Sequence, residues 1–427
     1  MLAWCCKIMS STKRGTRALN LSLRAATLGS RFLLIFFLAR FLQPSQLGLY
    51  GLLSATIGYS LYLLGFDFYT FTTREILKRS RKEWGGLLKD QAALSLLLYA
   101  IFLPLLNLVF VFGLLPWRLA GWFFALLVLE HINQEMSRLL VAISEQLLAS
   151  ILLFLRQGSW AITLTALMAF DPNARNLDYV FGAWTLSGLL AALAGTRRLA
   201  QMQLGGWHKN VDWGWIRTGL KISIPLLLAT LAVRGAFTLD RYWLQALGGL
   251  EVLGAYVLFM GISGTLMAFL DAAVFAFSYP GLISASHAHD ASLFRQKLRA
   301  LLLQTLAISV GFAIVSTLAL PFLLGWLDKP TYTEQQYLYP WVLAVMVLYA
   351  LGMVPHYALY AQGLDRPIIR SHLASLVVFV ASTAVAAPLY PQLAVVIGLC
   401  CAFLAVLIWK AWAFFAATPT DYWRTPS

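Results

Sequence analysis

Twelve long apolar stretches fill most of this 427-residue chain. Each has about 19–30 residues, which lets an α-helix cross a hydrocarbon core of roughly 30 Å. They lie at 17–39, 47–69, 91–114, 117–142, 146–170, 178–196, 216–239, 250–280, 299–326, 336–361, 367–389 and 391–415. Because 60% of the residues are hydrophobic and only 12% are charged, a soluble enzyme is excluded. The pattern predicts an all-α integral membrane protein.

The distribution of basic residues predicts the topology of these spans. The net charge is +14, from 32 Lys and Arg against 18 Asp and Glu. With the N-terminus placed inside, 22 of the basic residues fall on the inner side, Lys410 among them, five on the outer side and five within spans. The bias predicts that both termini are cytoplasmic. Because the basic runs lie at membrane edges, they predict contact with lipid headgroups rather than nucleic acid.

The chain also divides into two similar halves. Six spans precede the polar segment 197–215, and six follow it, which predicts lobes at 1–196 and 216–427 with a cytoplasmic connector between them. Leu-Gly-Leu-Tyr opens the second span at Leu47, and Leu-Gly-Ala-Tyr opens the eighth at Leu253. Internal repeats of this kind are common in transporters, whose sites lie where the repeats meet.

Three arginines of the first span share one helix face. Arg17, Arg24 and Arg31 recur every seven residues, which is close to two helical turns. Arg17 is near enough to the membrane edge for its side chain to reach the headgroups. Arg24 and Arg31 lie deeper, where a lone cation costs several kcal/mol, so they require an internal partner or a wet cavity.

The same requirement applies to Arg156 in the fifth span and Arg234 in the seventh, and Arg241 follows shortly after. Two interpretations stay open. Each arginine could pair with a membrane-embedded acid and hold helices together, or the set could line a cationic cavity that receives an anion. Arginine suits the second role because its guanidinium forms two hydrogen bonds to one phosphate or carboxylate.

Acidic residues within the spans are fewer. Glu130 and Glu135 lie in a polar run of the fourth span, and Glu135 is three residues from Arg138, a spacing at which the two side chains pair. Glu130 has no basic partner on its own helix, so it is a candidate proton carrier. Glu135, Asp271 and His356 are further candidates for ion coupling.

No motif for chemistry appears. The chain has no Walker phosphate loop, so it carries no ATPase, and it has no spaced Cys and His set for zinc. The sequence therefore predicts no catalytic residue, no metal and no cofactor.

Short motifs resemble those of bacterial polysaccharide flippases. Leu47–Gly48 with Tyr50 opens the second span and Arg74–Glu75–Ile76 closes it, as is typical of that family. Asp240–Arg241–Tyr242 before the second Leu-Gly-x-Tyr resembles the start of the family's second half. By helix count the resemblance covers essentially the whole chain. It points to the O-antigen flippase (Wzx-type) branch of the multidrug/oligosaccharidyl-lipid/polysaccharide (MOP) exporter superfamily.

The resemblance implies two pseudo-symmetric six-helix lobes around a central cavity, with alternating access driven by an ion gradient. The cargo would be an undecaprenyl-diphosphate-linked oligosaccharide, such as an O-antigen repeat unit of lipopolysaccharide, moved across the bacterial inner membrane. The glycan polymerase and the chain-length machinery would then be candidate partners.

Two alternatives remain open. A drug/proton antiporter of the same superfamily shares the twelve-helix plan, although cationic drugs favour an acidic cavity. A membrane glycan polymerase is the second alternative, but such enzymes generally need a large outer loop, and the outer loops here are short.

Overall fold

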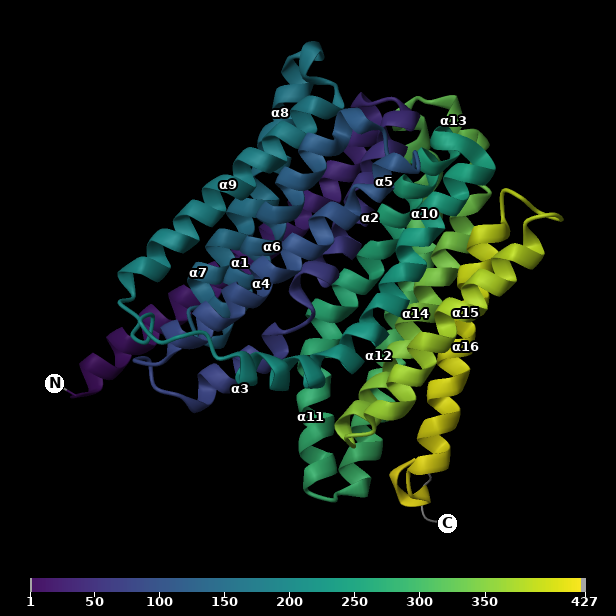
Figure 1. The fold of residues 1–427 in the computed structure, drawn as a ribbon. Helices are drawn as coiled ribbons and strands as arrows, with labels where there is room; N and C mark the ends of the chain where they lie inside the picture. Colours follow the sequence, from purple (N-terminus) through teal and green to yellow (C-terminus); the bar gives the residue numbers. More distant parts are fainter. Residues whose placement is uncertain (1, 424–427) are drawn as a thin grey trace. The chain divides into compact units, whose positions relative to one another are not determined.

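The computed structural model describes the backbone of residues 2–423 and the side chains of residues 18–423. Within that range all regular secondary structure is helical, without strands (Figure 1). The side chain of Arg17 lies outside the described residues. The predicted fold class, an all-α membrane protein, is confirmed.

The chain forms two compact units. Unit 1 comprises residues 1–41 and 56–227, and unit 2 comprises residues 42–55 and 228–427. Helix α2 (Pro44–Gly65) therefore divides between them, since its first turns pack with the second half of the chain. The predicted lobes at 1–196 and 216–427 follow the chain order. They therefore do not include the transfer of residues 42–55 to unit 2.

Unit 1 is built from helices of the first half. They are α1 (Leu2–Phe41), the end of α2, α3 (Tyr69–Lys78), α4 (Trp84–Leu106), α5 (Leu108–Val111), α6 (Ala120–Ala142), α7 (Gln146–Leu153), α8 (Trp160–Phe170) and α9 (Leu177–Gln201), with 3-10 turns η1 (Trp117–Leu119) and η3 (Pro172–Ala174). Between α7 and α8 the chain forms a π-helical segment, η2 (Phe154–Ser159). Such segments are rare and frequently occur at functional sites.

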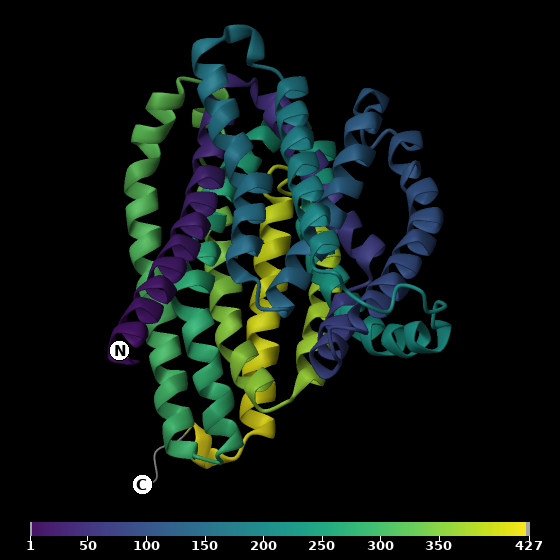
Figure 2. The same ribbon diagram turned by 90° about the vertical axis from the view of Figure 1, so that its left-hand side faces the viewer.

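Unit 2 is built from helices of the second half. They are α10 (Trp213–Leu270), which starts in unit 1, the π-helical segment η4 (Asp271–Phe275), α11 (Ala276–His287), α12 (Ala291–Leu327), α13 (Pro330–Glu334), α14 (Leu338–Ala361), α15 (Asp365–Ala386), α16 (Ala394–Ala417) and the 3-10 turn η5 (Thr420–Tyr422). Figure 2 shows α11 and α12 as an antiparallel hairpin. Helix α16 packs against both α14 and α15.

Ten helical segments of the described chain are long and apolar enough to cross a membrane. One of them, 213–287, contains Gly249, whose φ of 79° and ψ of 179° are not helical. Because only glycine adopts such angles readily, the chain breaks there into two spans. Helix α6 is not among the ten, since its polar residues lower its hydropathy. When the segment 213–287 is counted as two spans and α6 is added, the described helices provide the twelve spans that the sequence predicts.

The two Leu-Gly-x-Tyr motifs pack against each other within unit 2. A Cβ atom on Gly48 would overlap the carbonyl oxygen of Leu250 and lie 3.1 Å from the backbone nitrogen of Gly254. A Cβ on Gly254 would overlap the carbonyl oxygen of Pro44. Glycines allow this close backbone approach, as they do in many membrane helix pairs. The repeat therefore marks the point where the start of α2 crosses α10.

The predicted connector lies against unit 1. Residues 202–212 link α9 to α10 without regular helix. The backbone nitrogen of Gly85 donates to the carbonyl oxygen of Gly205 at 2.8 Å, and Lys89 Nζ donates to the carbonyl oxygen of Lys209 at 2.8 Å. These bonds fasten the connector to the start of α4.

Candidate functional site

Arg24 and Arg31 bond to uncharged partners on a neighbouring helix. Arg24 Nε donates to Ser150 Oγ at 3.0 Å, and Arg31 Nη1 donates to Gln157 Oε1 at 3.1 Å. The two donors are seven residues apart on α1, and so are the two acceptors on α7 and η2. Helix α1 and the α7–η2 segment therefore run parallel and in register. Among the described residues no carboxylate pairs with either arginine, and both side chains are exposed.

Arg156 forms a buried ion pair with Glu130. The distance from Arg156 Nε to Glu130 Oε2 is 3.6 Å, and the two side chains are 8% and 9% exposed. Trp184 Nε1 donates to the other oxygen of Glu130 at 2.8 Å, and the ring of Trp160 stacks on that of Trp184. The pair thus joins α6, η2 and α9. Sequence reasoning found no partner for Glu130 because the partner lies on another helix.

Arg156 keeps unused hydrogen-bonding capacity in this position. Its Nε and Nη1 atoms are buried without a hydrogen-bond acceptor. Arg31 also repels it electrostatically, so positive charge is in excess around η2. A buried guanidinium with orphan donors is a binding group for an anion or for ordered water.

Glu135 is bound to Arg138, as the spacing predicts. Arg138 Nη1 and Glu135 Oε1 lie 2.6 Å apart, and Gln91 Nε2 donates to the second carboxylate oxygen at 2.5 Å. The guanidinium of Arg138 lies over the ring of Tyr69, 3.6 Å from its centroid. Neighbouring side chains thus satisfy both the carboxylate of Glu135 and the guanidinium of Arg138, which is characteristic of a structural role.

In unit 2, Arg241 belongs to a local network. It pairs with Asp240 at 3.3 Å, and the hydroxyl of Tyr256 donates to the second oxygen of Asp240 at 2.5 Å. Asp240 and Tyr256 are fully buried. Tyr256 is the last residue of the second Leu-Gly-x-Tyr motif, so this network holds the two parts of α10 on either side of Gly249.

Arg234 and Asp271 form a second group in unit 2. Both side chains are exposed, and they attract each other electrostatically. Asp271 is the first residue of the π-helical segment η4, just as Arg156 lies in the π-helical segment η2. Each half of the chain therefore carries one predicted site residue on a π-helical segment.

The predicted coupling residue His356 lies next to a buried lysine. Lys410 Nζ is 3.3 Å from His356 Nδ1 and 2.9 Å from His372 Nε2, and Lys410 is 1% exposed. The two imidazole rings stack 6.0 Å apart. We call Lys410, His356 and His372 the basic cluster; it joins α14, α15 and α16.

One residue of the topology count belongs to the basic cluster. Lys410 is counted above with the inner-surface residues, but the structure buries it among helices. Sequence reasoning also missed His372. The available signal was a lysine inside the apolar stretch 391–415, which requires a partner in the same way as the intramembrane arginines. Among the described residues, no group of three His, Cys, Asp or Glu side chains could hold a metal ion.

No protein-family model and no curated protein matches this sequence. Solved structures do match. An inward-facing multidrug resistance MATE family transporter of the MOP superfamily superposes with a TM-score of 0.72 at 15% identity, over 93% of this chain and 98% of that one. The chain has the MATE transporter fold.

Two further solved structures support this. MATE in complex with MaD3S gives a TM-score of 0.59 at 15% identity, over 95% of this chain and 96% of that one. A MOP superfamily transporter from Pyrococcus furiosus gives 0.58 at 15% identity, over 93% of each chain. The latter is described as having a binding pocket of reverse polarity that suggests a different function. All of these neighbours are transporters rather than enzymes.

Proposed function

We propose that this protein flips an undecaprenyl-diphosphate-linked oligosaccharide across the bacterial inner membrane by alternating access. The MATE fold supports membrane transport in general. The choice of an anionic cargo rests on the charges that this chain places inside its spans.

One observation carries the proposal: Arg24 and Arg31 lie within a membrane span without an acidic partner among the described residues. Deep within the spans that include α1, α6 and η2, the chain places four arginines against two glutamates; they are Arg24, Arg31, Arg138 and Arg156, with Glu130 and Glu135. A diphosphate cannot cross hydrocarbon unaided, since an unpaired charge there costs many kcal/mol. Guanidinium groups replace its lost hydration, while the polyprenyl tail stays in lipid.

A drug/proton antiporter is the second candidate. The structural neighbours favour it, because the inward-facing transporter above and a further, outward-facing one are multidrug resistance transporters. The excess of arginine favours the flippase, since cationic drugs would be repelled. An anionic drug is the one antiporter substrate that fits both observations.

The basic cluster is the coupling site in this proposal. Glu130 and Glu135 each pair with an arginine, and Asp271 lies near Arg234. Each of these three carboxylates therefore already has a cation as its neighbour, which leaves the basic cluster as the coupling site. In the basic cluster, three basic groups share hydrogen bonds within one buried site, where more than one charge is strongly disfavoured. Such a site binds and releases a proton as its surroundings change.

Arginine substitutions in a gene-deleted host test the cargo. Arg24→Ala and Arg31→Ala should each abolish surface glycan while membrane protein levels stay unchanged. Arg40→Ala, a change at the basic residue in the last turn of α1, is the control and should leave the glycan intact. Normal glycan in both test variants would refute the anionic-cargo assignment, and loss of the protein itself would indicate a structural role.

A further inference from the structure

Unit 2 contains a groove that the proposed transport function does not use. It has a volume of about 1000 Å³ and lies between α12 on one side and α14 and α16 on the other, with η5 at one end. Its lining is mostly apolar. At this volume it is as large as the pockets that proteins use to enclose whole ligands.

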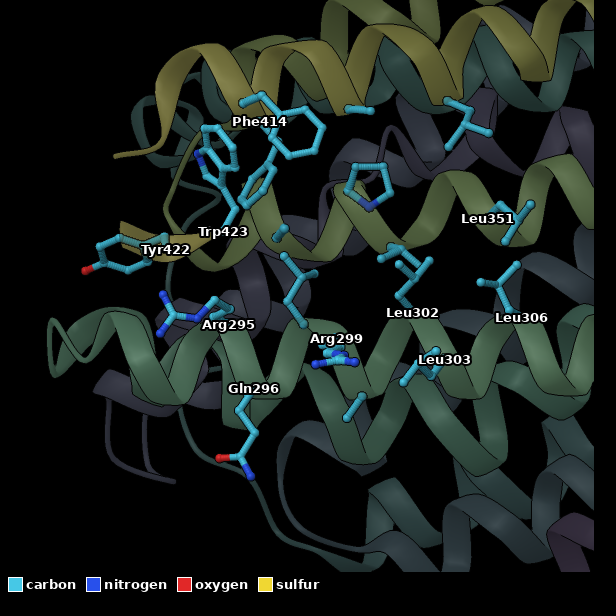
Figure 3. A pocket seen from close by; sticks show the side chains of 18 of the residues that line it. Arg295, Gln296, Arg299, Leu302, Leu303, Leu306, Leu351, Phe414, Tyr422 and Trp423 are labelled. Carbon is cyan, nitrogen blue, oxygen red and sulfur yellow. The ribbon is translucent and has the colours of Figure 1, made fainter. Parts of the chain in front are cut away.

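Polar and apolar residues separate along the groove. Arg295 and Arg299 lie at the end formed by the start of α12, where Tyr422 and Trp423 also stand. Leucines, among them Leu302, line the other end (Figure 3). A ligand that fits this lining has an anionic head and an extended hydrocarbon part.

The two arginines have different surroundings. Arg295 Nη1 donates to the backbone oxygen of Asp421 at 2.6 Å and so holds η5 as a wall of the groove. Arg299 is exposed and forms no hydrogen bond or ion pair with the described residues. Its guanidinium is therefore available to a ligand.

The length of α12 indicates where its arginines lie relative to the membrane. Its 37 residues span roughly 55 Å, well beyond the hydrocarbon core of about 30 Å. The arginines lie in its first turns, at the membrane edge, and the leucines lie within the core. Tyrosine and tryptophan favour this same interfacial level.

We propose that this groove binds an anionic phospholipid, with the phosphate at Arg299 and Arg295 and the acyl chains along the leucines. Basic pockets between membrane helices are known to bind anionic lipid headgroups. A zwitterionic lipid would gain less, because its own ammonium opposes the arginines. The proposal does not depend on the cargo, since a lipid in this groove would fill the space between α12 and the helices α14 and α16 whatever the protein transports.

Tryptophan quenching by brominated lipids provides the test. Full-length protein in phosphatidylcholine nanodiscs would be compared with the Trp423→Phe variant, and the difference isolates the emission of Trp423 from that of the other tryptophans. Brominated phosphatidylglycerol should quench this emission at a several-fold lower mole fraction than brominated phosphatidylcholine. Each arginine near the surface contributes roughly fivefold to such a preference.

Two charge variants make the test specific. Arg299→Gln should lower the preference for phosphatidylglycerol about fivefold. Lys297→Ala removes a cation two residues away that lies against Gly281 of α11, outside the groove lining, and should preserve the preference.

Three results would overturn the proposal. They are equal quenching by the two lipids, a preference that Arg299→Gln leaves unchanged, and displacement by undecaprenyl diphosphate at a lower mole fraction than by unlabelled phosphatidylglycerol. The last result would assign the groove to the carrier lipid. If surface glycan is lost in Arg24→Ala while the lipid preference is absent, the flippase assignment stands and the groove assignment fails.

Discussion

The buried pair of Glu130 and Arg156 gives a quantitative prediction. At 3.6 Å and an effective dielectric constant of about 20, two unit charges attract by roughly 4–5 kcal/mol. Removing one partner leaves the other charge buried and uncompensated, which typically costs about 3–5 kcal/mol. Arg156→Met and Glu130→Gln should therefore each destabilise unit 1 strongly.

The double variant separates the pair from its surroundings. Removing both charges leaves no uncompensated ion, and buried ion pairs replaced by neutral side chains are often neutral or stabilising. Glu130→Gln with Arg156→Met should thus recover most of the lost stability. Glutamine keeps an oxygen that accepts from Trp184 Nε1, so this hydrogen bond persists in the double variant.

Thermal unfolding in detergent, followed by size-exclusion chromatography, measures this cycle. Each single variant should lower the midpoint by on the order of 10 °C, and the double variant should lie near the wild type. Additive losses in the double variant would show that the two side chains do not interact. The interaction energy from such a cycle is reliable only for residues in contact.

Three further predictions follow from unit 2. Gly48→Ala should lower the unfolding midpoint, because overpacking against backbone costs about 1–3 kcal/mol, whereas Gly58→Ala, which meets nothing within 4 Å, should be tolerated. Tyr256→Phe should cost about 1.5–3 kcal/mol, since it removes a hydrogen bond to the buried carboxylate of Asp240; an unchanged midpoint would exclude that bond. Lys410→Met should reduce proton-driven transport in membrane vesicles to background while the protein still folds, and an undiminished rate would remove the basic cluster from the coupling mechanism.

The helices themselves could be predicted well from sequence. Hydrophobic length is a local property, and the predicted span 336–361 nearly coincides with α14 at Leu338–Ala361. The break between the seventh and eighth spans was also placed correctly, near Gly249. Segments outside the hydrocarbon were predicted poorly, since α12 begins at Ala291 rather than at 299. Helices continue into water, where hydropathy does not mark their ends.

The partners of polar residues could not be predicted in the same way. Glu135 and Arg138 lie on one helix, so their spacing alone predicted the pair that the structure shows. Glu130 and Arg156 lie on different helices, and their contact depends on how those helices rotate and pack. The same holds for Lys410 and His372.

The repeated Leu-Gly-x-Tyr motif could be recognised from sequence only in part. Its symmetry was visible in the sequence, but its role as a close crossing was not. The close approach of the Gly48 backbone to Leu250 becomes evident only from the packing of α2 on α10.

The most direct test of the central proposal is deletion of the gene in its own host, followed by glycan staining and extraction of lipids. The flippase assignment predicts loss of surface glycan, with the oligosaccharide accumulating on its undecaprenyl carrier at the cytoplasmic face. Normal surface glycan with altered drug sensitivity would contradict it and support the antiporter. Loss of long chains alone, with single repeat units still reaching the surface, would instead indicate a polymerase.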